Sequence, residues 1–164
     1  MDSFYIGKLK GVGKLWQLTA CDAACGYGIA QVTRGTPRPA HAIVFLRERV
    51  VPAYRRAGHP VRAVLTDRGP KWGPRFTAAC TAAQIGHRRT KPGHPWTNSF
   101  VEPLQGTILT EHWRVIFRQT YFARADQLER SLQRNLRFYN RERTHRGYRL
   151  NGRTPGAVFD ARAR

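Results

Sequence analysis

Three short segments rich in aromatic and β-branched residues lie at the beginning of the chain, ahead of any helical pattern. They span residues 4–6, 15–20 and 27–33, and glycines at positions 7, 11, 13 and 26 stand beside or between them. Segments of this composition separated by glycine are typical of strands joined by tight turns. The sequence therefore predicts that the chain opens with a three-stranded antiparallel meander.

Helical and strand-like patterns alternate after the meander. The first helix is predicted by apolar residues at helical spacing, which end before Gly58: Ile43, Leu46, Val50 and Tyr54. A compact strand follows over residues 61–66, then a second helix through Phe76 and Cys80 that Gly86 is expected to close, then a short strand over 87–90. A crossover helix between strands is most easily accommodated as a right-handed parallel connection. We therefore expect a mixed α/β fold.

The last third of the chain is dominated by helical patterns. Residues 91–98 contain three turn formers and predict a loop, and a long helix is expected to begin near Asn98 or Ser99, either of which can cap it. Beyond residue 120 one helix face is apolar, with Leu128, Leu132, Leu136 and Tyr139. Thr154 followed by Pro155 predicts the start of a short terminal helix. At 164 residues the chain fits one domain, with a core over about 1–117 and a helical extension and basic tail over 118–164.

The charge balance indicates a polyanionic partner. Lys and Arg number 29 against 10 Asp and Glu, a net charge of +19, while 41% of the residues are hydrophobic, which excludes a disordered basic tail. Nucleic acid is the simplest such partner, and an anionic membrane surface is the weaker alternative. Arginines on the outward face of the long helix can contact phosphates, although such a face can also be only solvated. The candidate DNA-binding residues are Arg88, Arg89, Lys91, Arg130, Arg134, Arg137, Arg141, Arg143, His145 and Arg146.

The lack of targeting signals and the spacing of the cysteines indicate where the protein acts and which cysteine-based sites it lacks. The sequence contains neither a signal peptide nor an apolar run long enough to cross a membrane, so we expect a cytoplasmic, nucleoid-associated protein. Cys21, Cys25 and Cys80 form no CxxC pair, which argues against both a disulfide framework and a zinc site. We interpret them as small buried hydrophobic residues.

Three acidic residues stand at the ends of predicted elements in a chain with few acids. Asp2 lies at the first strand, Asp67 ends a compact strand and Glu102 opens a helix. Carboxylates from separate elements are the ligands that Mg²⁺ and Mn²⁺ prefer, and two such ions can promote an in-line phosphoryl transfer. On spacing alone the simpler interpretation is favoured, namely that the aspartates form turns and the glutamate complements a helix dipole.

Several longer runs carry a family resemblance. They are DSFYIGKLKGVGKLWQLTACD, LTDRGPKWGPRF, GHRRTKPGHPWTNSFVEPLQGTI and FYNRERTHRGYRLNGRTPGAVF. Together they resemble the integrase catalytic core of bacterial insertion-sequence transposases, the DDE group related to retroviral integrases. The likeness covers nearly the whole chain.

The resemblance implies a fold, a site and a reaction. The fold would be ribonuclease H-like, with the meander and parallel strands in one central sheet and helices on both faces. The D, D, E triad matches Asp2, Asp67 and Glu102, with 34 residues between the last two, and would hold two Mg²⁺ or Mn²⁺ ions. The implied reaction is DNA cleavage at element ends followed by strand transfer to target DNA, carried out by a homo-oligomer. Asp22 matches a recurrent acid of the family that is not a metal ligand.

Some positions depart from the family pattern. Arg68 replaces the usual Asn after the second Asp and would bring a cation beside the metals, Ser99 replaces a Gly, and Pro103 directly follows Glu102. A proline beyond the first helical turn removes a hydrogen bond and would misdirect the Glu102 carboxylate. No helix-turn-helix pattern precedes the core, so a separate helix-turn-helix protein is an expected partner. The alternatives are a catalytically inactive remnant that only binds DNA, and a general RNA-binding basic protein.

Overall fold

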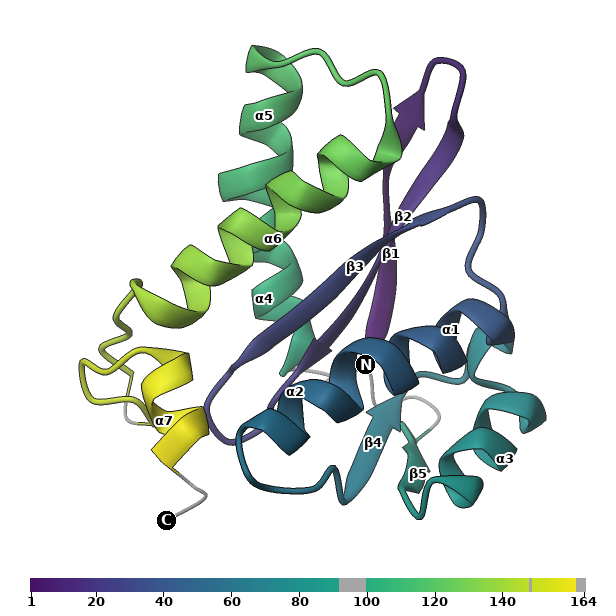
Figure 1. Ribbon diagram of the computed structural model, residues 1–164, viewed down its shortest axis with the longest axis vertical. Coiled ribbons are helices and arrows are strands. Elements are labelled where there is room, and N and C mark those ends of the chain that lie inside the picture. The colour runs from purple at the N-terminus through teal and green to yellow at the C-terminus, as the bar shows by residue number, and fades with distance from the viewer. Residues whose placement is uncertain (92–99, 148, 162–164) are drawn as a thin grey trace.

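The chain opens with the predicted antiparallel meander. The structure, a computed structural model, describes residues 1–91, 100–147 and 149–161 (Figure 1). β1 (Asp2–Leu9), β2 (Gly13–Cys21) and β3 (Gly28–Arg34) form one sheet in the order β1-β2-β3. Asp2 pairs with Thr19 across the first hairpin, and Cys21 pairs with Gly28 across the second. Each strand extends past the apolar pattern because polar residues at its ends also pair in the ladder.

The predicted first helix is continuous but contains a wider turn. It consists of α1 (Pro39–Phe45), a π-helical segment (Leu46–Val50) and α2 (Val51–Arg56). Pro52 stands at the start of α2 and has no amide to donate to the preceding turn. The wider hydrogen-bonding turn just before it accommodates that loss, as single π turns do within other helices.

Two short parallel strands follow. β4 (Ala63–Thr66) pairs in parallel with β5 (Gly86–Arg89), and between them lie a 3-10 turn (Pro70–Trp72) and α3 (Pro74–Ala82). The expectation that Gly86 closes the second helix was wrong. The helix ends at Ala82, the left-handed residue of the turn is Gln84 with φ 56°, and Gly86 is the first residue of β5.

The meander and the parallel pair meet at the start of β1. The backbone nitrogen of Met1 donates a hydrogen bond to the carbonyl of Leu65, so β1 begins beside the end of β4. The paired strands otherwise form a three-stranded and a two-stranded sheet. This junction brings the start of one strand next to the end of another.

The rest of the described chain is helical. α4 (Val101–Thr107), a second π-helical segment (Ile108–Trp113) and α5 (Arg114–Gln119) run in succession, followed by α6 (Ala125–Arg141) and α7 (Pro155–Ala161). The predicted capping residues Asn98 and Ser99 lie outside the described residues. The terminal helix begins as predicted, with the amide of Ala157 donating to the Thr154 hydroxyl over 3.2 Å. None of the described helices is long and apolar enough to cross a membrane.

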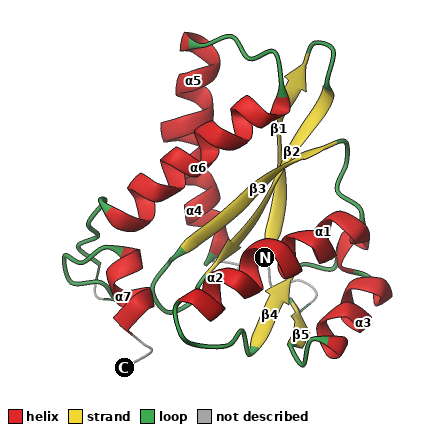
Figure 2. Cartoon of the chain, viewed as in Figure 1, coloured by secondary structure: helices red, strands yellow, loops and turns green. Residues whose placement is uncertain are grey.

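Helices cover both faces of the meander (Figure 2). On one face Leu15 and Ala30 share a hydrophobic cluster with Leu104 of α4 and with Leu128 and Leu132 of α6. On the other face the cluster joins the strands to the first helix, β4 and α3, and its members include Leu18, Ala20, Phe45, Val64 and Phe76. Residues of β2 alternate between the two clusters because successive side chains of a strand point to opposite faces. The α/β fold with helices on both faces is therefore confirmed.

Candidate functional site

The three candidate acids stand at element ends that converge. Asp2 is the first residue of β1, Asp67 follows β4 directly, and Glu102 is the second residue of α4. Neighbours of all three line one groove of about 680 Å³: Met1, Leu65 and Val101. Asp22 and Arg88 line the same groove. The fold thus brings three segments that are distant in sequence to one place.

Asp67 is held by the turn that follows β4. Its Oδ1 accepts a hydrogen bond of 2.7 Å from the amide of Gly69, and its Oδ2 lies 3.3 Å from Nζ of Lys71. A Cβ at position 69 would stand only 2.9 Å from Oδ1 of Asp67, so a larger residue there would displace the carboxylate. Both carboxylate oxygens therefore already have donors within the same short loop.

Asp2 lies close enough to Asp67 for the two charges to interact. Its Oδ1 accepts a hydrogen bond of 2.6 Å from the amide of Ser3. Burial raises the pKa of Asp2, and the negative charge of Asp67 raises it further, while the Ser3 hydrogen bond and the Lys71 ammonium lower it. A desolvated carboxylate next to a second carboxylate is an arrangement that a cation stabilises.

Glu102 occupies a different environment. Its side chain is exposed, and among the described residues no three His, Cys, Asp or Glu side chains lie close enough to hold one metal ion. The expected distortion from Pro103 does not arise, because the described helix begins at Val101. Pro103 is then the third helical residue, whose amide would have no helical partner in any case.

Arg68 does not supply the cation that the sequence led us to expect beside the acids. It is exposed, and its Nε donates a hydrogen bond of 3.0 Å to the carbonyl of Thr90. The cation at Asp67 is Lys71, four residues further along the chain. The sequence analysis missed Lys71, because the 3-10 turn that brings it back to Asp67 was not predicted from the residues.

Asp22 has a structural role. Its Oδ1 accepts 3.0 Å hydrogen bonds from the amides of Ala24 and Cys25, and its Oδ2 accepts one of 2.9 Å from the Tyr54 hydroxyl. Burial and the nearby Asp22 charge raise the pKa of Tyr54, so this hydroxyl stays protonated and donates. The carboxylate shapes the turn between β2 and β3.

The candidate DNA-binding residues near β5 divide by what they contact. Arg88 is exposed and lines the groove, and Lys91 is exposed just beyond the strand. Arg89 contacts other residues of the chain instead. Its guanidinium donates a hydrogen bond of 3.0 Å to the carbonyl of Trp72 and one of 3.2 Å to the Thr77 hydroxyl. Arg88 is therefore the member of this group that lines the groove near the candidate acids' neighbours.

The candidates on α6 and in the segment that follows it also divide into cations with and without an ion pair. Arg130 lies 2.9 Å from Asp126, Arg141 pairs with Asp160, and Arg143 pairs with Glu111. The exposed candidates without an ion pair to any described residue are Arg134, Arg137 and Arg146. His145 is half-buried, with its ring 5.2 Å from that of Tyr139. Burial and the Arg143 charge lower the pKa of His145, so it is neutral at neutral pH.

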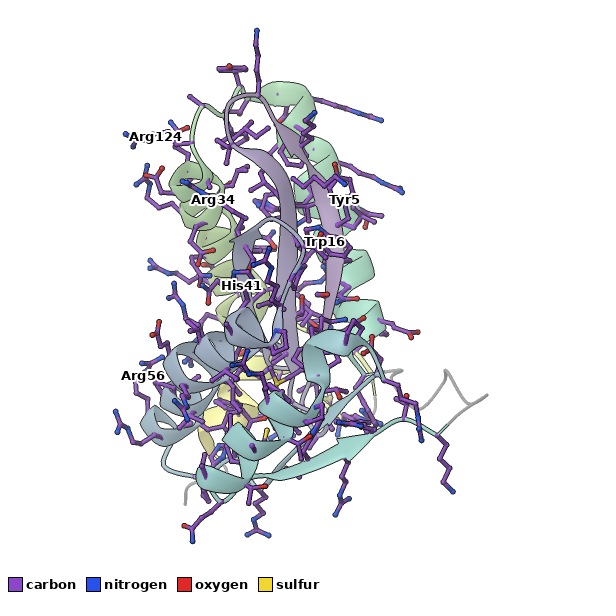
Figure 3. All side chains as sticks on the ribbon, turned by 90° about the vertical axis from the view of Figure 1, so that its right-hand side faces the viewer. Tyr5, Trp16, Arg34, His41, Arg56 and Arg124 are labelled. Atoms are coloured by element: carbon purple, nitrogen blue, oxygen red, sulfur yellow. The ribbon has the colours of Figure 1, made fainter. Side chains whose placement is uncertain are left out.

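A second groove collects arginines from two segments. It has a volume of about 360 Å³ and lies along β3, with Arg137 and Arg141 of α6 on one side and Arg49 and Arg56 of the first helix on the other. Arg56 projects outward from α2 (Figure 3). Arg49 and Arg56 were missed in the sequence, because only the folded sheet brings the first helix opposite α6.

The cysteines agree with the sequence interpretation. All three are free, Cys25 and Cys80 are buried, and Cys21 is partly buried. Burial raises the pKa of Cys21 to about 12 and that of Cys80 to about 11, so both remain thiols at neutral pH. They act as small hydrophobic residues.

Comparisons with known proteins agree with this architecture. The family model described as "Integrase core domain" matches residues 83–155. A chain from the simian T-cell lymphotropic virus intasome, in complex with PP2A regulatory subunit B56 gamma, is similar over 96% of this chain, with a TM-score of 0.75 and 20% identity. The match covers 52% of that chain, so the present chain spans about half its length. The catalytic core domain of BIV integrase is similar over 96% of this chain and 91% of its own, with a TM-score of 0.65 and 16% identity. Comparison with curated proteins gave no match.

The family match and the fold agree on one assignment. The matched residues begin in the turn before β5 and end at the start of α7, and therefore include α4 with Glu102. Both structural similarities cover 96% of this chain and therefore extend well beyond the residues that the family model matches. The chain therefore has the ribonuclease H-like fold of integrase cores, and its residues 83–155 match the integrase core domain model.

Proposed function

We propose that this chain is the catalytic core of a transposase that carries out metal-dependent DNA cleavage and strand transfer. One observation carries the proposal. Met1, which precedes Asp2, donates a hydrogen bond to the carbonyl of Leu65 near the end of β4, and the charge of Asp67 acts on Asp2. The residue before Glu102 lines the same groove as Met1 and Leu65. Two interacting carboxylates, next in sequence to residues of a groove that the exposed Arg88 also lines, are suited to phosphate chemistry.

The donor set at Asp2 and Asp67 fits a hard divalent cation. Both side chains offer carboxylate oxygens, and the desolvated Asp2 gains from a compensating positive charge. Asp2, Asp67 and, as the third ligand, Glu102 would hold Mg²⁺ or Mn²⁺, two ions in all. When bound, such ions supply Lewis acidity to an in-line phosphoryl transfer. Gly69 orients Asp67 through its amide.

Binding of DNA is assigned to the exposed cations. Arg88 and Lys91 would contact phosphates close to the acids, and the arginines of α6 would contact phosphates further away. Element ends and target DNA are the proposed substrates. A homo-oligomer on DNA and a separate helix-turn-helix protein are the proposed partners, because one core offers one set of acids to two DNA ends.

Plasmid nicking tests the proposal. The purified chain is incubated with supercoiled plasmid and Mn²⁺ beside an Asp67→Asn variant, and DNA binding is followed on the same samples. We expect Asp67→Asn to lose nicking and keep binding, since it removes a ligand and no phosphate contact. Asp126→Asn is the matched control, because Asp126 lies on α6 and pairs with Arg124 and Arg130, and it should still nick. Equal nicking by the wild type and Asp67→Asn would contradict the assigned site.

A second candidate function is DNA binding without cleavage. It is favoured by one observation, that Lys71 already pairs with Asp67 while no three-ligand cluster exists among the described residues. A chain of this kind would bind DNA with the same salt dependence, because counterion release depends only on phosphate contacts. Binding by both proteins with nicking by neither would support this function.

A further inference from the structure

The ammonium group of Lys71 lies where a cation is needed. Its Nζ is 3.3 Å from Oδ2 of Asp67, and the Lys71 side chain is only 14% exposed whereas that of Asp67 is 41% exposed. Lysine is rarely enclosed to this degree unless it is paired. The lysine side chain is therefore more buried than the carboxylate with which it pairs.

Packing around Lys71 fixes this position. Pro70 begins the 3-10 turn that carries Lys71. A hydrogen bond of 2.9 Å from the amide of Trp72 to the carbonyl of Gly69 closes this turn. The Nζ atom lies 5.2 Å from the centre of the Trp72 ring, within the range of a cation–π contact. Trp72 is fully buried. The turn and the indole together direct the ammonium toward the acids.

The same ammonium also acts on Asp2. Lys71 lowers the pKa of Asp2, and Asp67 raises it by a smaller amount, after the larger influences of burial and the Ser3 hydrogen bond. The geometry agrees: the ammonium contacts Asp67 directly, and Asp67 follows the strand whose Leu65 carbonyl accepts a hydrogen bond from Met1, the residue before Asp2. Lys71 thus offsets the repulsion between Asp2 and Asp67 in the absence of any metal ion.

We propose that Lys71 is an internal counter-ion of the Asp2 and Asp67 pair, and that a divalent metal ion binds these acids only in competition with it. This inference rests on the proposed metal site. A metal ion near Asp67 would stand within a few ångströms of the ammonium, and the repulsion between the two cations lowers the affinity for the metal. The lysine stem can swing the ammonium away, at the cost of its contacts with Asp67 and Trp72. Lys71 therefore sets the metal concentration at which the site becomes occupied.

Binding of Mn²⁺, measured by the disappearance of the free-ion electron paramagnetic resonance signal, tests the competition without any activity assay. Lys71→Met removes the charge but keeps a long stem against Trp72, and Lys71→Arg keeps the charge. We expect Lys71→Met to bind Mn²⁺ at least about tenfold more tightly than the wild type, a difference of about 1.4 kcal/mol. Lys71→Arg should bind as weakly as the wild type. The double variant Lys71→Met with Asp67→Asn should lose the gain.

Thermal unfolding provides a second readout. Without metal, Lys71→Met should melt at a lower temperature than the wild type, because Asp2 and Asp67 then repel each other without compensation. Added Mn²⁺ should raise its melting temperature more than that of the wild type, since a ligand stabilises in proportion to its occupancy. Circular dichroism at low temperature establishes that the variant is folded.

The outcomes separate the two proposals. Mn²⁺ binding that depends on Asp67 but has equal affinity in the wild type and Lys71→Met would overturn the counter-ion role and leave the metal site standing. Mn²⁺ binding that does not depend on Asp67 in either protein would overturn the metal site and the inference together. Tighter binding by both Lys71→Met and Lys71→Arg would also overturn the inference, because the charge would then be irrelevant.

Discussion

Asn140 of α6 forms two hydrogen bonds with the backbone of Gly28 in β3, each 2.8 Å long. The Gly28 amide donates to Oδ1 of Asn140, and Nδ2 of Asn140 donates to the Gly28 carbonyl. Nε2 of Gln133 donates a hydrogen bond of 2.9 Å to the carbonyl of Ala30, and the amide of Val32 donates one of 2.8 Å to Oε2 of Glu129. The side chains of α6 therefore pair with the outer edge of β3 as a neighbouring strand would, and they protect that edge from pairing with another chain.

Asn140→Ala should destabilise the domain by about 2–3 kcal/mol, because it leaves a buried amide and a buried carbonyl unpaired. Urea unfolding followed by circular dichroism measures the difference. Asn135→Ala is the matched control, since Asn135 lies on the same helix and its side chain has no hydrogen bond with the described residues. A loss for Asn135→Ala as large as that for Asn140→Ala would show that helix composition, and not the edge contact, is responsible.

His112 should make the domain sensitive to mild acid. Burial lowers the pKa of His112 to about 4, with a further contribution from the Arg134 charge, and its Nε2 has no hydrogen-bond partner among the described residues. The unfolded chain binds this proton near pH 6.5, so the free energy of unfolding falls as the pH decreases from about 6.5 to 4, by about 3 kcal/mol in all.

Replacement of His112 by Phe tests this origin. The apolar ring can keep the contact with Trp113, whose ring centre lies 4.7 Å from that of His112. Urea unfolding at pH 7 and pH 4.5 should show a smaller loss of stability in His112→Phe than in the wild type. An unchanged pH dependence would assign the effect to other groups.

Asp2→Asn should stabilise the metal-free domain at neutral pH. Burial raises the pKa of Asp2 in the folded state above its ordinary value of 3.8. Between these two pKa values the folded protein binds more protons than the unfolded chain, so the free energy of unfolding falls as the pH rises through this range. The neutral amide avoids this loss. Thermal melts should give a higher melting temperature for Asp2→Asn at pH 7 and no difference at pH 3.

Asp160→Asn provides a comparison for Asp2→Asn. Asp160 is exposed and pairs with Arg141, so its replacement removes an attraction and should not raise the melting temperature. A gain for both variants would indicate a general effect of lower charge. No gain for Asp2→Asn at pH 7 would contradict the raised pKa of Asp2 in the folded domain.

Arginines of α6 should differ in their contribution to DNA binding. Arg137 lines the groove beside β3 and has no ion pair with a described residue, whereas Arg130 is paired with Asp126. Arg137→Ala should reduce the slope of log affinity against log salt concentration by about 0.9, the value for one phosphate contact, and Arg130→Ala should reduce it less. Fluorescence anisotropy with duplex DNA at several salt concentrations gives the slopes. Equal slopes for Arg137→Ala and the wild type would exclude this groove from the interface.

Local patterns in the sequence determined the elements. Short aromatic and β-branched segments separated by glycines predicted the meander, and helical spacing predicted the first helix and α6. The Thr154 and Pro155 pair predicted the start of α7. Helices, strands and turns depend on residues only a few positions apart. Their side chains repeat in direction every 3.6 residues in a helix and every 2 in a strand, so the order of apolar residues reveals the element. The acids at element ends were predicted for the same reason.

Only the tertiary structure decided which charges meet. The contact of Asp67 with Lys71 and not Arg68 depends on how the 3-10 turn packs Trp72 into the core, and the start of α4 at Val101 renders Pro103 harmless. The pairing of Asn140 with Gly28 and the groove shared by Arg49 and Arg137 join segments that are far apart in sequence. Charge and hydrogen-bond interactions of this kind depend on distance and burial after folding, which no local periodicity encodes.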